Sequence, residues 1–147
     1  MKWEYRWMVV LPLAASLQLA GCNHTPEDTE EPKPVKVEHL AGAEPARITL
    51  IESAAKRLQM QTDTVREVEI DGAKRLVMPY AALLYDTQGA TWVFTSTAPL
   101  TYVRHSITVD RIVGEQVVLT EGPPAGTAVV TVGAAELYGS EIEFEEE

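Results

Sequence analysis

Cysteine and basic charge are scarce in this chain of 147 residues. Its single cysteine, Cys22, excludes an internal disulfide and a metal cage built from several thiolates. Twelve lysines and arginines stand against 22 acidic residues, which gives a net charge of −10. Nucleic-acid binding and electrostatic docking on anionic lipid both require clustered basic side chains. The charge balance therefore argues against both kinds of partner.

Motifs that carry catalysis or metal binding are also missing. No glycine-rich phosphate loop follows a strand-like run, and no recognisable nucleophile motif surrounds the serines, Ser53, Ser96, Ser106 and Ser140. Two isolated histidines, His24 and His39, lie in an acidic stretch where such side chains are usually solvated. Met60 and Met78 offer thioethers, which suit monovalent copper, but methionines this far apart usually fill a core. We expect no enzyme activity, no cofactor and no resident metal.

The first 21 residues have the pattern of a bacterial lipoprotein signal. Lys2 and Arg6 precede an apolar run, Trp7–Ala20, which suits a signal peptide and is too short to span a bilayer comfortably. The run ends in Leu-Ala-Gly-Cys22, which resembles a lipobox, the motif whose cysteine sulfur receives a diacylglycerol before cleavage. The alternative is an inert, buried cysteine. We predict a signal peptide over residues 1–21 and lipidation at Cys22.

Residues 22–45 are predicted to form a flexible acidic tether. The stretch is rich in proline and acidic residues and has few large apolar groups, so burial cannot offset the entropy of ordering it. Lipidation of Cys22 would attach the chain to a bilayer of the bacterial envelope, facing the periplasm. Asn23 follows the cysteine where an aspartate would favour the inner membrane in enteric bacteria, and it therefore favours the outer membrane. At the other end, residues 145–147 are predicted to be an acidic, solvated tail.

Between tether and tail, residues 46–144 have the pattern of one small, mainly β domain. Short β-branched and aromatic runs alternate with Gly, Pro and Asp turn signals, which include Asp71-Gly72 and Asp86–Gly89. The pattern is that of a β-barrel or sandwich of about six or seven strands. The expected strands are Arg47–Ile51, Thr62–Ile70, Lys74–Met78, Ala90–Thr95, Leu100–Val113, Gln116–Thr120 and Thr127–Val132. One or two short helices are expected, at Glu52–Met60 and Gly133–Tyr138.

The run Leu100–Val113 has the clearest alternation in the chain. One predicted face carries Val103, His105, Ile107 and Val109, and the other carries Arg104, Ser106, Thr108 and Asp110. His105 therefore falls on the apolar side, where we expect a partly buried histidine with one hydrogen-bond partner. A titrating switch or a metal ligand is the alternative.

Four motifs in this domain resemble the membrane-proximal domain of periplasmic adaptor subunits, the membrane fusion proteins of RND-type efflux pumps. They are V-x-P-x-x-A-L from Val77 to Leu83, W-V-F from Trp92 to Phe94, R-x-x-I-x-V from Arg104 to Val109, and L-x-E-G-x-x-A-G-x-x-V-V-x-x-G-A from Leu119 to Ala134. The segment Arg47–Val65 resembles the stretch by which such adaptors lead into this domain. The resemblance implies a β-domain that binds proteins.

The chain departs from that family between its two matching blocks. A full adaptor inserts a barrel domain, a lipoyl-like domain and a long α-hairpin there, whereas Ile70 to Met78 spans the gap in a few residues here. The expected function is a reduced or accessory adaptor, with an inner-membrane efflux transporter or other adaptor subunits as protein partners. The alternative is a stand-alone periplasmic lipoprotein that binds metal ions or small hydrophobic compounds.

Overall fold

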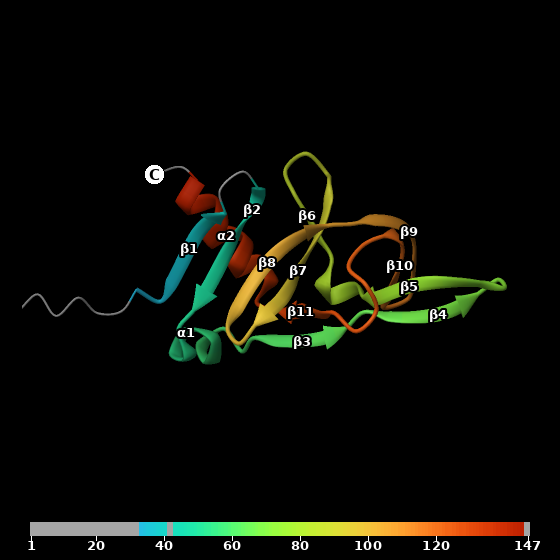
Figure 1. Ribbon diagram of the computed structural model, residues 1–147, viewed down its shortest axis with the longest axis horizontal. Coiled ribbons are helices and arrows are strands. Elements are labelled where there is room, and N and C mark those ends of the chain that lie inside the picture. Colours follow the sequence, from blue (N-terminus) through green and yellow to red (C-terminus); the bar gives the residue numbers. More distant parts are fainter. Residues whose placement is uncertain (1–32, 41–42, 146–147) are drawn as a thin grey trace, which may run out of the picture.

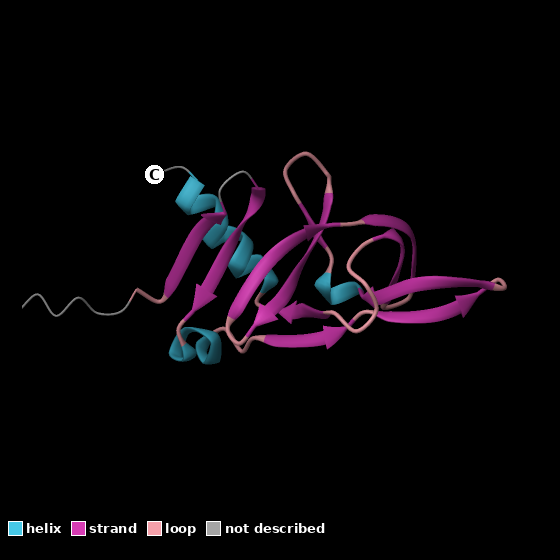
Figure 2. Ribbon diagram, viewed as in Figure 1, coloured by secondary structure: helices cyan, strands magenta, loops and turns pink. Residues whose placement is uncertain are grey.

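The computed structural model describes residues 33–40 and 43–145, which form a mainly β structure (Figures 1 and 2). All strand pairings in this part of the chain are antiparallel. The two helices are α1 (Glu52–Arg57) and α2 (Ala134–Glu145). None of the described helices is long and apolar enough to cross a bilayer. The prediction of a mainly β domain is confirmed, but the described residues form eleven strands instead of the expected six or seven.

Two sheets pack as a sandwich and do not close into a barrel. The larger sheet has the order β1-β2-β8-β7-β11-β3, with β6 paired to β7. Its strands are β1 (Val35–Leu40), β2 (Ala43–Leu50), β3 (Gln61–Thr64), β6 (Leu84–Tyr85), β7 (Thr91–Ala98), β8 (Thr101–Ser106) and β11 (Ala128–Val132). The smaller sheet has the order β4-β5-β10-β9. Its strands are β4 (Arg66–Ile70), β5 (Ala73–Pro79), β9 (Thr108–Val113) and β10 (Gln116–Glu121).

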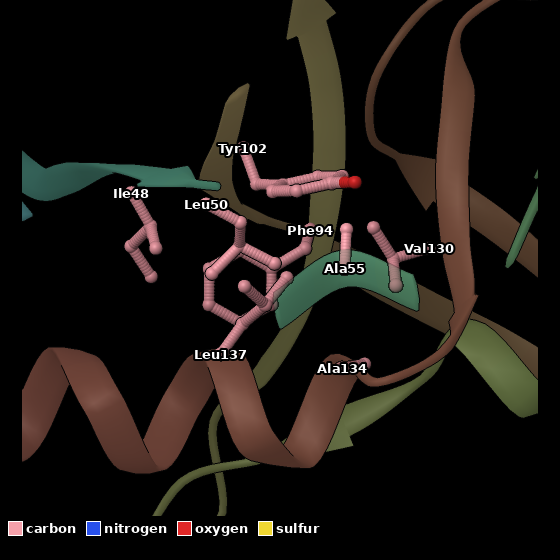
Figure 3. Packing of buried hydrophobic residues seen from close by; sticks show 8 residues of the cluster. All are labelled: Ile48, Leu50, Ala55, Phe94, Tyr102, Val130, Ala134 and Leu137. Carbon is pink, nitrogen blue, oxygen red and sulfur yellow. The ribbon is translucent and has the colours of Figure 1, made fainter. Parts of the chain in front are cut away.

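The larger sheet is buried on both faces, because successive side chains of a strand point to opposite sides. Phe94 and Val130 belong to a core that α1 and α2 cover, the helix-side core. Figure 3 shows Leu137 of α2 against Phe94 in this core. Their neighbours Val93 and Val129 belong to a second core that also includes residues of the smaller sheet. The domain therefore has three layers, with the larger sheet between the helices and the smaller sheet.

Two runs that were predicted as single strands are divided between the sheets. Thr62–Ile70 is split into β3 and β4 at Val65, and Leu100–Val113 is split into β8 and β9 at Ile107. Val65 and Ile107 are 1% and 5% exposed, and both lie in the core between the sheets. Alternation of apolar and polar residues continues through Ile107, so the pattern alone did not reveal that change of sheet. After Val65 the alternation slips by one residue, at Arg66-Glu67, and this slip was the available signal for the first change.

The second half of the predicted tether is ordered as a strand. Residues 35–40 form β1, which pairs with β2, and Val35 and Val37 pack against the helix-side core. The alternation of valine with lysine and glutamate in this segment supplies one apolar face, and pairing with β2 satisfies the backbone. Composition averaged over residues 22–45 concealed that short alternation. The first part of the predicted tether lies outside the described residues.

The C-terminal helix is longer than the sequence predicted. A helical turn was expected over Gly133–Tyr138, but α2 continues through Gly139 to Glu145. Leu137 and Glu141 are both fully buried. Their spacing of four residues places them on the same face of the helix, and that face packs on the larger sheet.

Candidate functional site

The predicted lipidation site, Cys22, and the tether histidine His24 both lie outside the described residues. His39 is exposed on β1. Met60 packs against the helix-side core and Met78 against the core between the sheets, so the two thioethers lie on opposite sides of the larger sheet. Within residues 33–40 and 43–145, no cluster of three or more His, Cys, Asp or Glu side chains could hold a metal ion.

His105 is exposed, so the predicted partial burial of this side chain is wrong. It pairs with the buried Val93 across β7 and β8, which places both on the side of the smaller sheet. That sheet covers Val93 and leaves His105 in solvent. The neighbouring Arg104, which the alternation assigned to the polar face, is covered by α2 instead.

Arg104 and Glu141 form a buried ion pair between the larger sheet and α2. Arg104 Nε lies 3.0 Å from Glu141 Oε2, and the two side chains are 11% and 1% exposed. The guanidinium carbon of Arg104 also lies 4.2 Å from the ring centroid of Trp92 and 5.3 Å from that of Tyr138, which are cation–π distances. Glu141 Oε1 accepts a hydrogen bond from the Ala46 amide at 3.3 Å.

These contacts hold α2 on the sheet and give the buried Glu141 a structural role. The sequence prediction missed Glu141 because it ended the last helical turn at Tyr138, before this residue. The helical spacing of Ala134, Leu137 and Glu141 was the signal available, since it aligns all three on one face. The cluster does not form an open site.

The turn between β6 and β7 is organised by Asp86. Its carboxylate accepts hydrogen bonds from Trp92 Nε1 at 3.0 Å, from the Gln88 amide at 2.9 Å and from the Ala90 amide at 2.8 Å. The bond from the Trp92 indole, followed by the backbone donors, lowers the pKa of Asp86 below its usual value of 3.8. The predicted turn at Asp86–Gly89 is confirmed, and the carboxylate connects it to the cation–π cluster.

We expect Trp92 emission to report the charge of Asp86. Because the folded pKa is lowered, the ionised carboxylate stabilises the turn above the unfolded pKa, and this contribution is lost as the pH falls through the folded value. In a form without residues 1–21, Trp92 is the only tryptophan. Its fluorescence should change below about pH 4, and Asp86→Asn should abolish this transition. Asp71→Asn, at the β4–β5 turn, should retain it. The same acid transition in Asp86→Asn would contradict the assignment.

A groove of about 430 Å³ opens beside the smaller sheet. Its apolar floor and wall come from β4, β5 and the 3₁₀ turn Tyr80–Ala82. Its polar rim comes from β3, Arg66 of β4, the β9–β10 turn and Gln116 of β10. The lining residues are Asp63, Thr64, Arg66, Val68, Val77, Met78, Pro79, Tyr80, Ala81, Glu115 and Gln116. Tyr80 is 47% exposed and Val68 is 36% exposed.

Two charged groups at the rim of the groove, Asp63 and Arg66, are paired with each other. The Thr64 amide donates to Asp63 Oδ1 at 2.7 Å, and Arg66 Nη2 lies 3.2 Å from the same oxygen. The backbone bond, then the arginine, lowers the pKa of Asp63 below its usual value. Among the described residues the groove has no paired acid and base aligned on a nucleophile. Its apolar floor and polar rim are typical of a contact surface for another polypeptide.

Comparison with known proteins finds similarity to a solved structure. No protein-family profile and no curated protein matches the chain. The structure is similar to the NMR structure of a 180-residue part of SilB from Cupriavidus metallidurans that comprises its N-terminal metal-binding site and membrane-proximal domain. The match has a TM-score of 0.43 and 18% identity, and it covers 70% of this chain and 63% of the SilB fragment. The function is therefore inferred from the residues of this chain.

Proposed function

We propose that this chain is a lipid-anchored, non-enzymatic protein-binding module of a bacterial envelope transport complex, acting as a reduced or accessory adaptor of an RND-type efflux transporter. The observation that carries the proposal is the set of adaptor-like motifs, which occupy positions that the fold requires. Its acylated Cys22 would hold it on the periplasmic side of a membrane. Its β-domain would contact the transporter or other adaptor subunits.

The motif residues support the proposal because several of them have a structural role. Val77 and Ala82 of the first motif are 5% and 0% exposed. Arg104 of the third motif forms the buried ion pair with Glu141. In the fourth motif, a Cβ on Gly122 would approach Leu119 Cδ1 to 2.8 Å, and Gly133 has a φ of +90°. Because these motif residues determine the fold, the match favours a fold shared with the adaptor domain. The partner would be selected by residues on exposed surfaces.

The adaptor family inserts its additional domains between the two matching blocks, and here that place is occupied by the β4–β5 hairpin. Register Ile70↔Ala73 closes the hairpin over Asp71 and Gly72. Both turn residues have positive φ, 54° and 76°, as in a type I′ turn. Figure 1 shows the hairpin projecting from the end of the domain. Without the long α-hairpin that full adaptors insert at this place, the chain would contact a partner close to the membrane.

Replacing Cys22 with alanine tests the membrane anchor. We expect the wild-type chain to fractionate with bacterial membranes and the Cys22→Ala chain to appear in the soluble periplasmic fraction. The reason is that Cys22 would carry all of the acyl chains that anchor the protein. Immunoblotting of the fractions and mass spectrometry of the N-terminal peptide provide the measurement. Asn23→Ala, one residue later, should remain in the membrane fraction. Membrane retention of Cys22→Ala would overturn the lipoprotein part of the proposal.

Crosslinking in intact envelopes tests the adaptor role. We expect a photo-crosslinker placed at exposed Tyr80 to capture an inner-membrane transporter or an adaptor subunit, identified by mass spectrometry. The same crosslinker at Gln88, exposed on the β6–β7 turn, serves as the matched position away from the groove. Recovery of no transport component from either position, with unchanged resistance to drugs and metals on deletion, would overturn the adaptor role.

A further inference from the structure

Besides the two-residue strand β6, the described part of the chain has four edge strands, and three of them belong to ladders with register shifts. The four are β1 and β3 at the edges of the larger sheet, and β4 and β9 at the edges of the smaller sheet. The ladders of β1, β3 and β9 all contain register shifts. Such bulges discourage further strand pairing. The β4 ladder is regular over its five pairs, Arg66↔Val77 to Ile70↔Ala73.

The hairpin geometry determines which backbone groups of β4 face outward. In a two-residue hairpin the closing pair is hydrogen-bonded, and hydrogen-bonded pairs then recur at every second position. Ile70, Val68 and Arg66 therefore direct their N–H and C=O groups toward β5. Glu67 and Glu69 direct theirs toward the open edge, and both are exposed. The edge thus offers the backbone groups of two glutamates to an incoming strand.

These two glutamates disfavour pairing of the edge with a second copy of itself. Antiparallel pairing requires outward-facing residues to lie opposite each other. On β4 both such residues are glutamates, so every antiparallel self-pairing places Glu opposite Glu. Like charges directly opposite are destabilising. The same arrangement favours a strand that places lysine or arginine at those positions.

The ion pairs within the domain leave the negative charge of Glu67 and Glu69 available to a partner. Lys74 Nζ lies 2.7 Å from Glu67 Oε1, but the side chains are 79% and 44% exposed, so the pair contributes little and can be exchanged. Glu69 has no ion pair among the described residues. On the other face of β4, Val68 borders the groove lined by Tyr80 and Val77. An incoming apolar side chain opposite Val68 would cover that groove.

We propose that β4 binds an extended segment of another protein as an added strand, and that this segment alternates basic residues opposite Glu67 and Glu69 with apolar residues over the groove. The main-chain bonds would supply affinity and the alternating side chains would supply specificity. The inference rests on the proposed function only in requiring a protein partner, and it gives that partner a defined chemistry.

Peptide binding to the purified full-length chain tests the inference. The probe is a short blocked peptide in which valine and lysine alternate, and the control has the same composition with its lysines grouped at one end. We expect the alternating peptide to bind more tightly by fluorescence anisotropy and to protect the amides of Glu67 and Glu69 from hydrogen exchange. Equal binding of the two peptides, or protection confined to other strands, would overturn the inference.

Two variants separate strand pairing from attraction to an acidic protein. Glu67→Lys/Glu69→Lys should weaken binding of the valine–lysine peptide about tenfold or more and allow a valine–glutamate peptide to bind. Glu69→Pro removes one outward N–H while sparing the β4–β5 ladder, and should abolish binding with an unchanged circular dichroism spectrum. Full binding by Glu69→Pro would refute strand addition. The envelope crosslinking experiment decides the adaptor role separately from this result.

Discussion

Replacing Glu141 with alanine is expected to lower the free energy of unfolding by about 3–5 kcal/mol, the usual cost of removing one partner of a buried ion pair. The change leaves Arg104 enclosed by α2 and β8 without its carboxylate, since only 11% of its side chain is exposed. It also removes the acceptor of the Ala46 amide. Urea denaturation, followed by circular dichroism, measures the loss. Because small domains are only marginally stable, we expect a large fraction of the Glu141→Ala variant to be unfolded at room temperature.

Two controls identify the origin of this loss. Glu143→Ala changes an exposed carboxylate on the same helix and should alter stability by less than about 0.5 kcal/mol. The double variant Arg104→Met/Glu141→Leu removes both charges and should recover most of the loss, because apolar replacement of a buried pair is often neutral or stabilising. Equal stability of Glu141→Ala and Glu143→Ala would contradict the structural role of the pair.

Gly133→Ala is expected to destabilise the domain by about 2–4 kcal/mol, through backbone strain and overpacking together. Gly133 joins β11 to α2 with a φ of +90°, in the region that side chains disfavour. A Cβ at this position would also fall on Met60 Sδ, which packs against the helix-side core. Thermal and urea unfolding of the variant measure the cost.

Gly126 provides the matched control for this prediction. Its φ is +91°, but a Cβ there would meet nothing within 4 Å, so Gly126→Ala measures the backbone strain alone. We expect Gly133→Ala to be more destabilising than Gly126→Ala by about 1–3 kcal/mol. Adding Met60→Ala to Gly133→Ala should reduce that difference. If both glycine variants lose the same stability, the contact with Met60 contributes nothing.

Local patterns predicted most of the β elements because each was marked by residues with a direct steric meaning. Asp71-Gly72 predicted the hairpin that joins β4 and β5, and the structure confirms it with two positive φ values. Alternation along β7 places Phe94 in the helix-side core and its neighbour Val93 in the core between the sheets, as strand geometry requires. The predictions for His105 and Arg104 assigned the alternating faces correctly. They were wrong about which face is covered, because other elements determine whether each face is covered.

Surfaces that combine distant segments could not be predicted from the sequence. The groove joins β3, β4, β5 and the β9–β10 turn, and its residues extend from Asp63 to Gln116. The sequence does not distinguish Glu67 and Glu69 from other surface charges. Their position becomes meaningful because β4 forms an open, regular sheet edge. The ion pair of Arg104 with Glu141 links residues 37 positions apart and was equally hidden.

The sequence by itself determined a mainly β domain with its principal turns, because turn residues and two-residue alternation act over a few neighbouring positions. It also determined the acidic balance that argues against nucleic acid. Only the tertiary structure decided which faces are covered, since burial depends on elements brought together from far along the chain. That is why Arg104 is enclosed while His105 is exposed, and why β4 is left as a regular edge that a basic strand can complete.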